Sequence, residues 1–480
     1  MFYPGKDEYV ALAAGHDLVP VYREALADVE TPVSVLQRFA GNTNAFLFES
    51  LEGGETWGRY SFVGIDPELL LDVDHRQGAT GGLEALRDVC RGLRVAEIPG
   101  LPRFFGGAVG VLGYEAAGEF ERLPVPKPGD RRVAARSRFL KVDKLIVFDN
   151  VRHTIKVVFC TRPTGGAAGA EQLYEQTCRQ IEAVIAALPE HVAEPVRSYP
   201  PAPFESNMTP DAYMDMVRRA REYIIEGDII QAVLSQRFSA QTDVPPLQLY
   251  RALRLTNPSP YTFFLKLGSQ TLVGSSPEVM VRLTGSRVEV RPIAGTRRRG
   301  ATEQEDRALA DELLSDEKEK AEHVMLVDLG RNDIGRVAEP GSVQVTDFMV
   351  IERYSHVMHM VSHVEGILRR EFDAYDVLKA TFPAGTLSGA PKIRAMQIIH
   401  ELEPSPRGAY GGAVGYLSYT GGMDFAITIR TLEIEDGEVS VQAGAGIVYD
   451  SDPEREHEET CQKSRGMRKA LALALDGLEL

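Results

Sequence analysis

The sequence is poor in cysteine and tryptophan, and it has no long apolar run. Its 480 residues include one tryptophan and four cysteines, namely Cys90, Cys160, Cys178 and Cys461. Cysteines scattered in this way, without a C-x-x-C pair, do not predict a disulfide framework or a zinc site. No segment approaches the roughly 18 apolar residues of a membrane-spanning helix, and the charged residues 6–8 interrupt any signal-peptide core. We therefore expect a cytoplasmic protein that has no membrane partner.

Basic residues are also in deficit. Lysine and arginine number 53, against 69 aspartates and glutamates, which gives a formal charge of −16. This balance argues against a nucleic-acid binder, because such proteins present a basic face. Apolar residues at 44% and charged residues at 25% are typical of a soluble globular chain with a buried core. At roughly 150 residues per domain, the length allows two or three domains.

A proline-rich segment divides the chain. Residues 186–207 contain five prolines, a composition that favours extended backbone. On either side of this linker we place a β-rich N-terminal region at residues 1–190 and a C-terminal region at residues 205–475.

Both regions show strand and helix patterns. In the first we expect strands at residues 44–50, 59–65, 139–148 and 151–160, with a hairpin at Asp149-Asn150. In the second, a helix capped by Thr209 and stopped by Gly227 precedes strands at residues 232–239, 261–267, 271–274 and 279–283. A long helix at 303–329, a meander at 413–450 and a final helix from Pro453 follow. Strands joined mostly by hairpins, with helices between them, predict an α+β fold with antiparallel sheets.

Two acidic helix faces are the strongest chemical signal. Glu319 and Glu322 follow Asp316 at three-residue spacing, and Glu456 and Glu459 repeat the spacing on the last helix. Residues three apart share a helix face. Two converging faces of this kind would offer carboxylate oxygens to Mg²⁺. The alternative is that both are solvated faces balanced by neighbouring basic side chains.

Glycine-rich turns and isolated polar residues give weaker signals. The run Gly444-Ala445-Gly446 after a strand could expose backbone N–H groups to an anion, or it could mark a β-bulge. Arg430, within an expected apolar strand, could bind a carboxylate or form a structural ion pair. His359, in another such strand, is by itself typical of a core histidine. The arginines at 297–299 are typical of a solvated loop.

Taken together, the ordered motifs of the chain resemble the chorismate-utilising enzymes, and among them the large components of anthranilate synthases. The matching segments are 227–237 (GDIIQAVLSQR), 275–278 (SSPE), 292–296 (PIAGT), 316–323 (DEKEKAEH), 329–333 (LGRND), 353–359 (RYSHVMH) and 383–392 (PAGTLSGAPK). The resemblance covers nearly the whole chain. It implies a sandwich of antiparallel sheets flanked by helices, with the active site between the sheets. The implied reaction converts chorismate and ammonia to anthranilate and pyruvate, the first step of tryptophan biosynthesis.

The resemblance also implies roles for individual residues. Glu322 and Glu459 would bind Mg²⁺, with Glu319 and Glu456 beside them, and the ion would hold the ring carboxylate. Glu278 and His359 would be the catalytic residues that assist departure of the hydroxyl group and of pyruvate, in an order that stays open. The substrate-binding positions would be Gly295, Thr296, Thr386, Tyr410, Arg430, Gly444, Ala445, Gly446 and Lys463.

Two positions distinguish this chain from other relatives. Ala294 stands where aminodeoxychorismate synthases typically have an attacking lysine, and Gln231 stands where isochorismate synthases typically have a lysine base. Both favour direct attack by ammonia. Because the chain has no G-x-C-x-G glutaminase turn, the resemblance implies a separate glutamine amidotransferase subunit. The alternatives are an aminodeoxychorismate synthase large component and a non-catalytic tryptophan-sensing scaffold.

A regulatory site is implied as well. Residues 47–50 and 257–261 resemble the two halves of the family's tryptophan pocket, so we expect Ser50, Pro260, Tyr261 and Thr262 to bind L-tryptophan. Thr262 stands where methionine is usual. Residues 1–190 would contribute this site, and residues 205–475 would bind chorismate. Inhibition requires that tryptophan bind a low-activity state better than the active one.

Overall fold

Two large antiparallel sheets form the centre of the protein. The structure is a computed structural model that describes residues 1–27, 29–50, 58–78, 81–125, 135–189, 195–354 and 357–479. Within these residues the strands of the first sheet are, in spatial order, β1 (Phe2–Tyr3), β2 (Val19–Leu26), β9 (Thr154–Thr161), β8 (Lys144–Asp149), β4 (Tyr60–Gly64), β3 (Asn44–Glu49), β12 (Tyr261–Leu267), β13 (Gln270–Ser276), β22 (Thr431–Glu435), β23 (Glu438–Ile447), β11 (Gln231–Gln241) and β10 (Glu205–Ser206), with β19 (Gly389–Ala390) also paired to β11.

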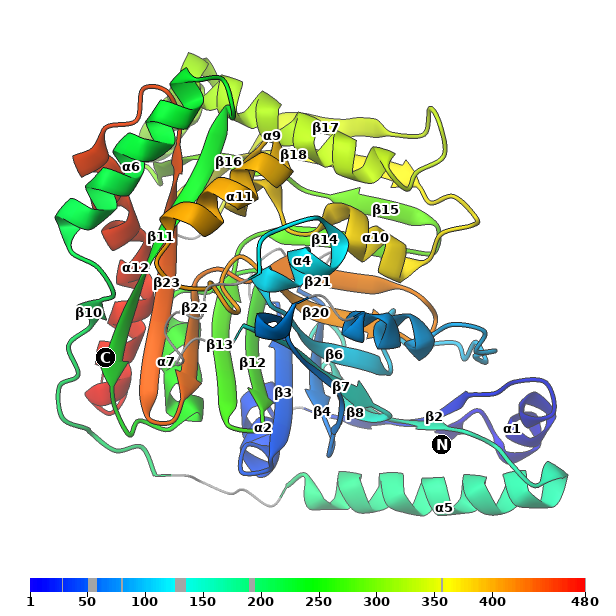
Figure 1. The fold of residues 1–480 in the computed structure, drawn as a ribbon. Helices are drawn as coiled ribbons and strands as arrows, with labels where there is room; N and C mark the ends of the chain where they lie inside the picture. The colour runs from blue at the N-terminus through cyan, green and yellow to red at the C-terminus, as the bar shows by residue number, and fades with distance from the viewer. Residues whose placement is uncertain are drawn as a thin grey trace.

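The second sheet crosses the first in Figure 1, where β11, β12, β13, β22 and β23 of the first sheet run up the picture and β14, β20 and β21 of the second run across it. Its described strands are, in spatial order, β16 (Ile293–Arg298), β18 (Val357–Ile367), β15 (Arg287–Val290), β14 (Val279–Thr284), β21 (Met423–Ile427), β20 (Ala413–Ser418), β6 (Gly107–Leu112), β7 (Arg136–Val142) and β5 (Glu68–Asp74), with β17 (Gln344–Arg353) also paired to β18. The predicted α+β fold with antiparallel sheets is confirmed.

Both sheets combine strands from the two sides of the proline-rich linker. In the first sheet β3 pairs with β12, and in the second β6 pairs with β20. The two sequence regions are therefore interleaved through continuous hydrogen-bonded ladders.

Helices cover the outer faces of the sheets. They are α1 (Lys6–Ala13), α2 (Pro32–Phe39), α4 (Ala117–Phe120), α5 (Gly166–Ala187), α6 (Pro210–Ile225), α7 (Pro246–Thr256), α8 (Glu303–Ser315), α9 (Glu317–Gly335), α10 (Ala374–Thr381), α11 (Lys392–Leu402) and α12 (Pro453–Leu475), with short 3₁₀ turns η1 (His75–Gln77), η2 (Gly82–Val89), η3 (Tyr114–Ala116) and η4 (Gly385–Leu387). Helices α6, α7 and α12 pack on the first sheet, and α9 packs on β16 and β18 of the second. None of the described helices combines the length and the apolar character that a bilayer crossing demands.

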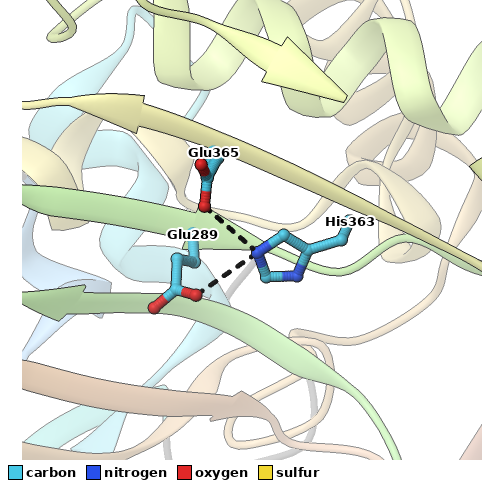
Figure 2. Close-up of side chains that lie close together, drawn as sticks. All are labelled: Glu289, His363 and Glu365. Atoms are coloured by element: carbon cyan, nitrogen blue, oxygen red, sulfur yellow. Dashed lines mark ion pairs between the residues drawn. The ribbon is translucent and has the colours of Figure 1, made fainter. Parts of the chain in front are cut away.

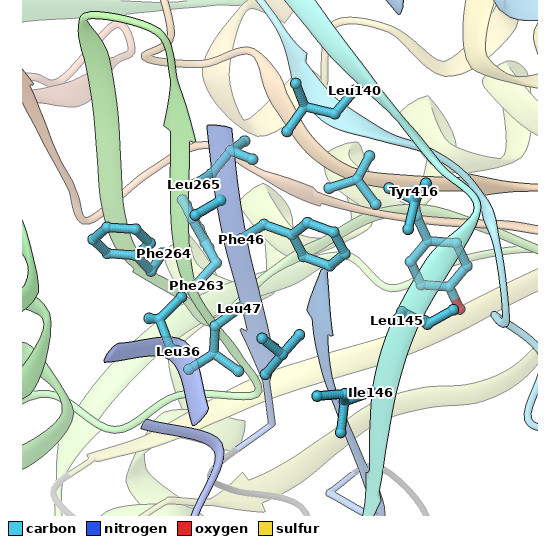
Figure 3. Packing of buried hydrophobic residues seen from close by; sticks show 14 of the residues in the cluster. Leu36, Phe46, Leu47, Leu140, Leu145, Ile146, Phe263, Phe264, Leu265 and Tyr416 are labelled. Atoms are coloured by element: carbon cyan, nitrogen blue, oxygen red, sulfur yellow. The ribbon is translucent and has the colours of Figure 1, made fainter. Parts of the chain in front are cut away.

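The main apolar core fills the space between the sheets and beneath the helices. Phe46 and Leu47 are neighbours on β3, so their side chains leave opposite faces of the strand. In Figure 3, Phe46 extends toward the strands that carry Leu140 and Tyr416 in the second sheet, whereas Leu47 lies beside Leu36 of α2. Full burial of each such side chain contributes about 1.5–3 kcal/mol.

The expected strand at 139–148 is wrong as a single element. The structure divides it into β7 and β8, which belong to different sheets. The division falls at Asp143, whose carboxylate pairs with Lys141 and Arg162. The hairpin between β8 and β9 is confirmed, with Asp149 opposite Thr154.

The expected helix at 303–329 is also divided, into α8 and α9. Asp316 leaves the helical conformation, with φ −72° and ψ 109°, and its side chain accepts hydrogen bonds from the N–H groups of Lys318 and Glu319. Asp316 thus caps α9 and does not lie on the face that Glu319 and Glu322 share. The helix at Thr209 begins as predicted, since the Thr209 side chain accepts a hydrogen bond from the N–H of Ala212.

Residues 413–450 form two hairpins and not one meander. The β20–β21 hairpin belongs to the second sheet, and the β22–β23 hairpin belongs to the first. The turn at Asp436-Gly437 has positive φ at both residues, 50° and 79°, as a type I′ turn requires. The chain passes from one sheet to the other between Ile427 and Thr431.

Candidate active site between the two sheets

Arg430 lies where the chain crosses between the sheets. The prediction that it lies inside an apolar strand is wrong, because it follows β21 and precedes β22. Its backbone is left-handed, with φ of 48°, and its carbonyl oxygen accepts a 3.1 Å hydrogen bond from the N–H of Ser275. This crossing brings the guanidinium close enough to act electrostatically on both Glu278 and His359.

Glu278 is a buried carboxyl group in the turn between β13 and β14. Its Oε1 accepts a 2.9 Å hydrogen bond from the Thr386 hydroxyl on η4. Burial raises the pKa of Glu278 to about 7, although the Thr386 hydrogen bond and the charges of Arg430 and Lys463 act in the opposite direction. A carboxyl group with this pKa is partly protonated at neutral pH, so it can donate a proton.

His359 lies on β18 and faces two substrate-binding candidates on β16. Its Nδ1 lies 3.0 Å from the hydroxyl oxygen of Thr296 and 3.2 Å from the carbonyl oxygen of Gly295. Because a carbonyl oxygen only accepts, the contact with Gly295 requires a hydrogen on Nδ1. Burial lowers the pKa of His359 to about 4. The imidazole is therefore neutral at physiological pH, and its Nε2 holds a free lone pair.

The two acidic helix faces act on each other. Burial raises the pKa of Glu322 on α9, and the charges of Glu319 and of Glu459 on α12 raise it further. Within the described residues these carboxylates do not place three ligand atoms within 4.8 Å of one another. Glu319 instead pairs with Arg297 at 3.1 Å, and Glu459 pairs with Lys463 at 2.7 Å. Like charges acting on a half-buried carboxylate favour a cation at this position.

Glu456 and Gly295 each lie near one of the acidic helix faces. Burial raises the pKa of Glu456 on α12, and the charge of Glu459 raises it further. Gly295 has a φ of 61°, and a Cβ there would lie 3.1 Å from Oε2 of Glu319. A glycine at this position therefore lets the β16 backbone approach the acidic face closely.

Lys463 joins the acidic faces to the glycine run. Its Nζ donates to the carbonyl oxygen of Gly444 at 3.0 Å as well as to Glu459. A Cβ on Gly444 would lie 2.7 Å from the hydroxyl oxygen of Tyr410, so a larger residue would displace that ring. The prediction of a glycine-rich turn is wrong here: residues 444–446 lie inside β23, where they pair with residues 233–235 of β11.

The arginine triplet is not a solvated loop. Arg297 and Arg298 end β16, and each arginine of the triplet pairs with acidic residues of α8 or α9 or of the turn between them. The contacts join Arg297 to Glu312, Asp316 and Glu319, Arg298 to Glu305, and Arg299 to Asp306. These ion pairs fix β16 against the helix that carries Glu319 and Glu322.

One buried ion pair near the site was not predicted from the sequence. Arg407 donates to Glu403 at 2.7 and 2.9 Å, and its guanidinium lies 5.6 Å from the ring centroid of Tyr410. Glu403 also accepts from the N–H and hydroxyl of Ser235. The pair therefore supports the ring beside Gly444. Its sequence signal, a Glu and an Arg four residues apart, is the same as that of a surface pair.

The four predicted tryptophan-binding residues lie together. Ser50, Pro260, Tyr261 and Thr262 all line a cavity of about 790 Å³ with walls from both sheets. Inside it, Asp424 accepts hydrogen bonds of 2.8 Å from the Tyr261 hydroxyl and from the Arg282 guanidinium. At one wall, the carboxylate of Glu49 is buried and held by Tyr250 and Arg254.

Comparisons with known proteins show the family of this chain. Residues 43–469 match the family described as chorismate binding enzyme, and the chain belongs to that family. Within it, the similarity extends over nearly the whole chain to proteins named anthranilate synthase component 1. The relative from Pseudomonas putida is 48% identical over 98% of this chain and 98% of its own length. The relative from Acetivibrio thermocellus is 45% identical over 98% of this chain and 99% of its own length.

Solved structures show the same relationship. A crystal structure of anthranilate synthase component I from Streptococcus pneumoniae is 38% identical, with a TM-score of 0.75, over 92% of this chain and 98% of that chain. The menaquinone-specific isochorismate synthase of Escherichia coli has a TM-score of 0.71 at 19% identity, over 97% and 98% of the two chains. The second similarity supports the fold alone.

Proposed function

We propose that this chain is the synthase component that converts chorismate and ammonia to anthranilate and pyruvate. The observation that carries the proposal is the presence of a buried carboxyl group of pKa about 7, Glu278, and a buried neutral imidazole, His359, both within electrostatic reach of Arg430. Full-length similarity to proteins named anthranilate synthase component 1 supports it. Ala294 supports ammonia as the nucleophile, because no lysine is present at that position to attack the ring.

The two buried groups suit opposite proton transfers. Thr386 occupies Oε1 of Glu278, so the other carboxyl oxygen is free to give a proton to the departing ring hydroxyl. His359 holds a hydrogen on Nδ1 and a lone pair on Nε2, so it is suited to accept the ring proton when pyruvate leaves. This division resolves, as a proposal, the order that the sequence left open.

The substrate is a dicarboxylate, and the site offers two places for anionic groups. Arg430 and Lys463 lie within electrostatic reach of Glu278 and would bind the enolpyruvyl carboxylate together with Tyr410 and the β23 backbone. Mg²⁺ would be held by Glu322 and Glu459, beside Glu319 and Glu456, and when bound would neutralise the ring carboxylate and polarise the ring. The raised pKa of Glu322, caused by burial and by its acidic neighbours, fits a cation there.

The ammonia would come from a separate glutamine amidotransferase, since the chain lacks its own glutaminase turn. We place the reaction in the cytoplasm. L-Tryptophan would bind in the 790 Å³ cavity and inhibit the conversion of chorismate.

Ser275 offers a route for that inhibition. Its hydroxyl oxygen lies 3.4 Å from that of Thr262 in the cavity wall, and its N–H donates to the carbonyl oxygen of Arg430. Displacement of Thr262 by tryptophan would thus act on the backbone that positions the Arg430 guanidinium.

Incubation with chorismate, Mg²⁺ and ammonium tests the function, with the product identified by fluorescence and mass. Anthranilate and pyruvate in equal amounts are expected. Release of aminodeoxychorismate would instead identify the alternative enzyme, and the absence of any turnover would favour a tryptophan-sensing scaffold.

A further inference from the structure

Three polar side chains outside the active site converge on one point of the second sheet. Glu289 of β15 lies directly opposite Glu365 of β18, and His363 lies two residues before Glu365 on the same face. Figure 2 shows the His363 ring directed between the two carboxylates. The opposite faces of these strands carry Val288, Val290 and Val364, which are buried in the core, so the register of the polar residues is fixed.

The separations of the donor atoms match those around a small metal ion. Nε2 of His363 lies 3.3 Å from Oε1 of Glu289 and 3.7 Å from Oε2 of Glu365, and all three donor atoms lie within 4.8 Å of one another. Nitrogen and oxygen ligands bound tetrahedrally to zinc at about 2.0–2.2 Å are about 3.3–3.6 Å apart. The side chains are 15%, 18% and 22% exposed for His363, Glu289 and Glu365, so the sheet restrains them while one side stays open.

The charges also favour a cation. Carboxylates directly opposite each other on neighbouring strands repel. In the structure Arg287 partly compensates, with its Nη1 3.3 Å from Oε2 of Glu365, but its side chain is 58% exposed, and such an exposed ion pair is weak. Arg282, which also faces Glu289, is already engaged by Asp424 at 2.8 Å.

We propose that Glu289, His363 and Glu365 form a binding site for a divalent transition-metal ion of the zinc class. The imidazole nitrogen selects against Mg²⁺ and Ca²⁺, which prefer oxygen ligands. Glu289 also lines the 790 Å³ cavity, so water in that cavity can complete the coordination. The ion would tie β15 to β18 and is separate from the Mg²⁺ proposed at Glu322 and Glu459.

Zinc binding to the intact chain in excess Mg²⁺ tests the proposal, measured by equilibrium dialysis and by the absorption of a Co²⁺ substitute. One equivalent is expected, weakened at least ~10-fold in His363→Gln and Glu289→Gln. His16→Gln is the matched control, because the Nδ1 of this histidine contacts the Leu12 carbonyl oxygen, four residues earlier in the chain and outside the proposed site. It should bind zinc as the wild type does. The unfolding temperature of each variant without zinc, and turnover of His363→Gln without tryptophan, show that the fold is intact.

Arg287→Gln separates a metal site from a plain ion-pair network. It removes the competitor for Glu365, so a metal site predicts tighter zinc binding. The proposal is overturned if the wild type binds no zinc in excess Mg²⁺, if the His363 and Glu289 variants bind it as tightly as the wild type, or if Arg287→Gln weakens binding. None of these results depends on the proposed reaction, which the chorismate assay tests separately.

Discussion

Two regions between the sheets differ in how their charges are balanced. In the 790 Å³ cavity the carboxylate of Asp424 is paired, since Arg282 and Tyr261 both donate to it at 2.8 Å. In the candidate active site Glu278 is buried with a pKa raised to about 7, and Glu322 is acted on by other carboxylates.

This difference separates chemistry from binding. A buried group whose charge is not fully compensated keeps a pKa near the working pH and can exchange a proton or hold a cation. Ion-paired side chains keep their protonation states, so a ligand can change only their positions. The candidate active site therefore suits proton transfer, and the cavity suits recognition of a ligand. Substitutions in each region test this contrast.

The largest effect is expected from Glu278→Gln. The amide can still accept the Thr386 hydrogen bond but cannot donate a carboxyl proton, so turnover with ammonium and chorismate should fall about 10²–10⁴-fold. Steady-state assays measure the loss of turnover, and calorimetric titration measures the affinity of the cavity for tryptophan. Tryptophan affinity should be unchanged. Wild-type turnover in this variant would remove Glu278 as the proton donor.

Removal of a metal ligand should have the next largest effect. In Glu459→Ala the Mg²⁺ concentration for half-maximal turnover should rise ~10–100-fold, because one carboxylate of the acidic faces is lost. Glu458→Ala is the matched control, since Glu458 is an exposed neighbour on the same helix. Equal Mg²⁺ dependence in the two variants would show that the wrong carboxylate was assigned.

The sequence predicted the local elements better than their assignment to sheets. The Thr209 cap and the Asp436-Gly437 turn depend on neighbouring residues alone, and both are confirmed. The divisions at Asp143 and Asp316 were missed, because single polar residues in long patterns do not show that the chain changes direction. The crossing at Arg430 was missed for the same reason. The turn and strand signals of two consecutive hairpins are the same whether the hairpins belong to one sheet or to two.

The candidate site depended on resemblance more than on pattern. Spacing placed Glu319 with Glu322, and Glu456 with Glu459, but it could not show that the two helices act on each other. Burial of Glu278 and His359, which sets their pKa values, arises from segments more than 60 residues apart in sequence. The buried pair of Arg407 and Glu403 had no distinguishing signal at all.

A pH profile should show the third effect. Because Glu278 must be protonated to act, kcat/KM should fall as pH rises through about 7, approaching tenfold per pH unit well above it. Because the pKa of His359 is about 4, this neutral imidazole should leave kcat/KM flat between about pH 5 and pH 6. The decline near pH 7 should be absent in Glu278→Gln. A decline that persists in that variant would belong to another group.

The smallest effect concerns the connection between the two regions. Ser275→Ala removes the hydroxyl that contacts Thr262 and donates to the Asn257 carbonyl oxygen. It keeps the N–H that holds the Arg430 carbonyl, so turnover without tryptophan should stay within about twofold of the wild type. The tryptophan concentration for half-inhibition should rise about 5-fold, at the low end of typical coupling energies. Tryptophan binding measured by calorimetry should change less than inhibition does, because the cavity walls remain. If binding and inhibition weaken equally, Ser275 contributes to the tryptophan pocket and not to the coupling. Another residue would then have to connect the cavity with the candidate active site.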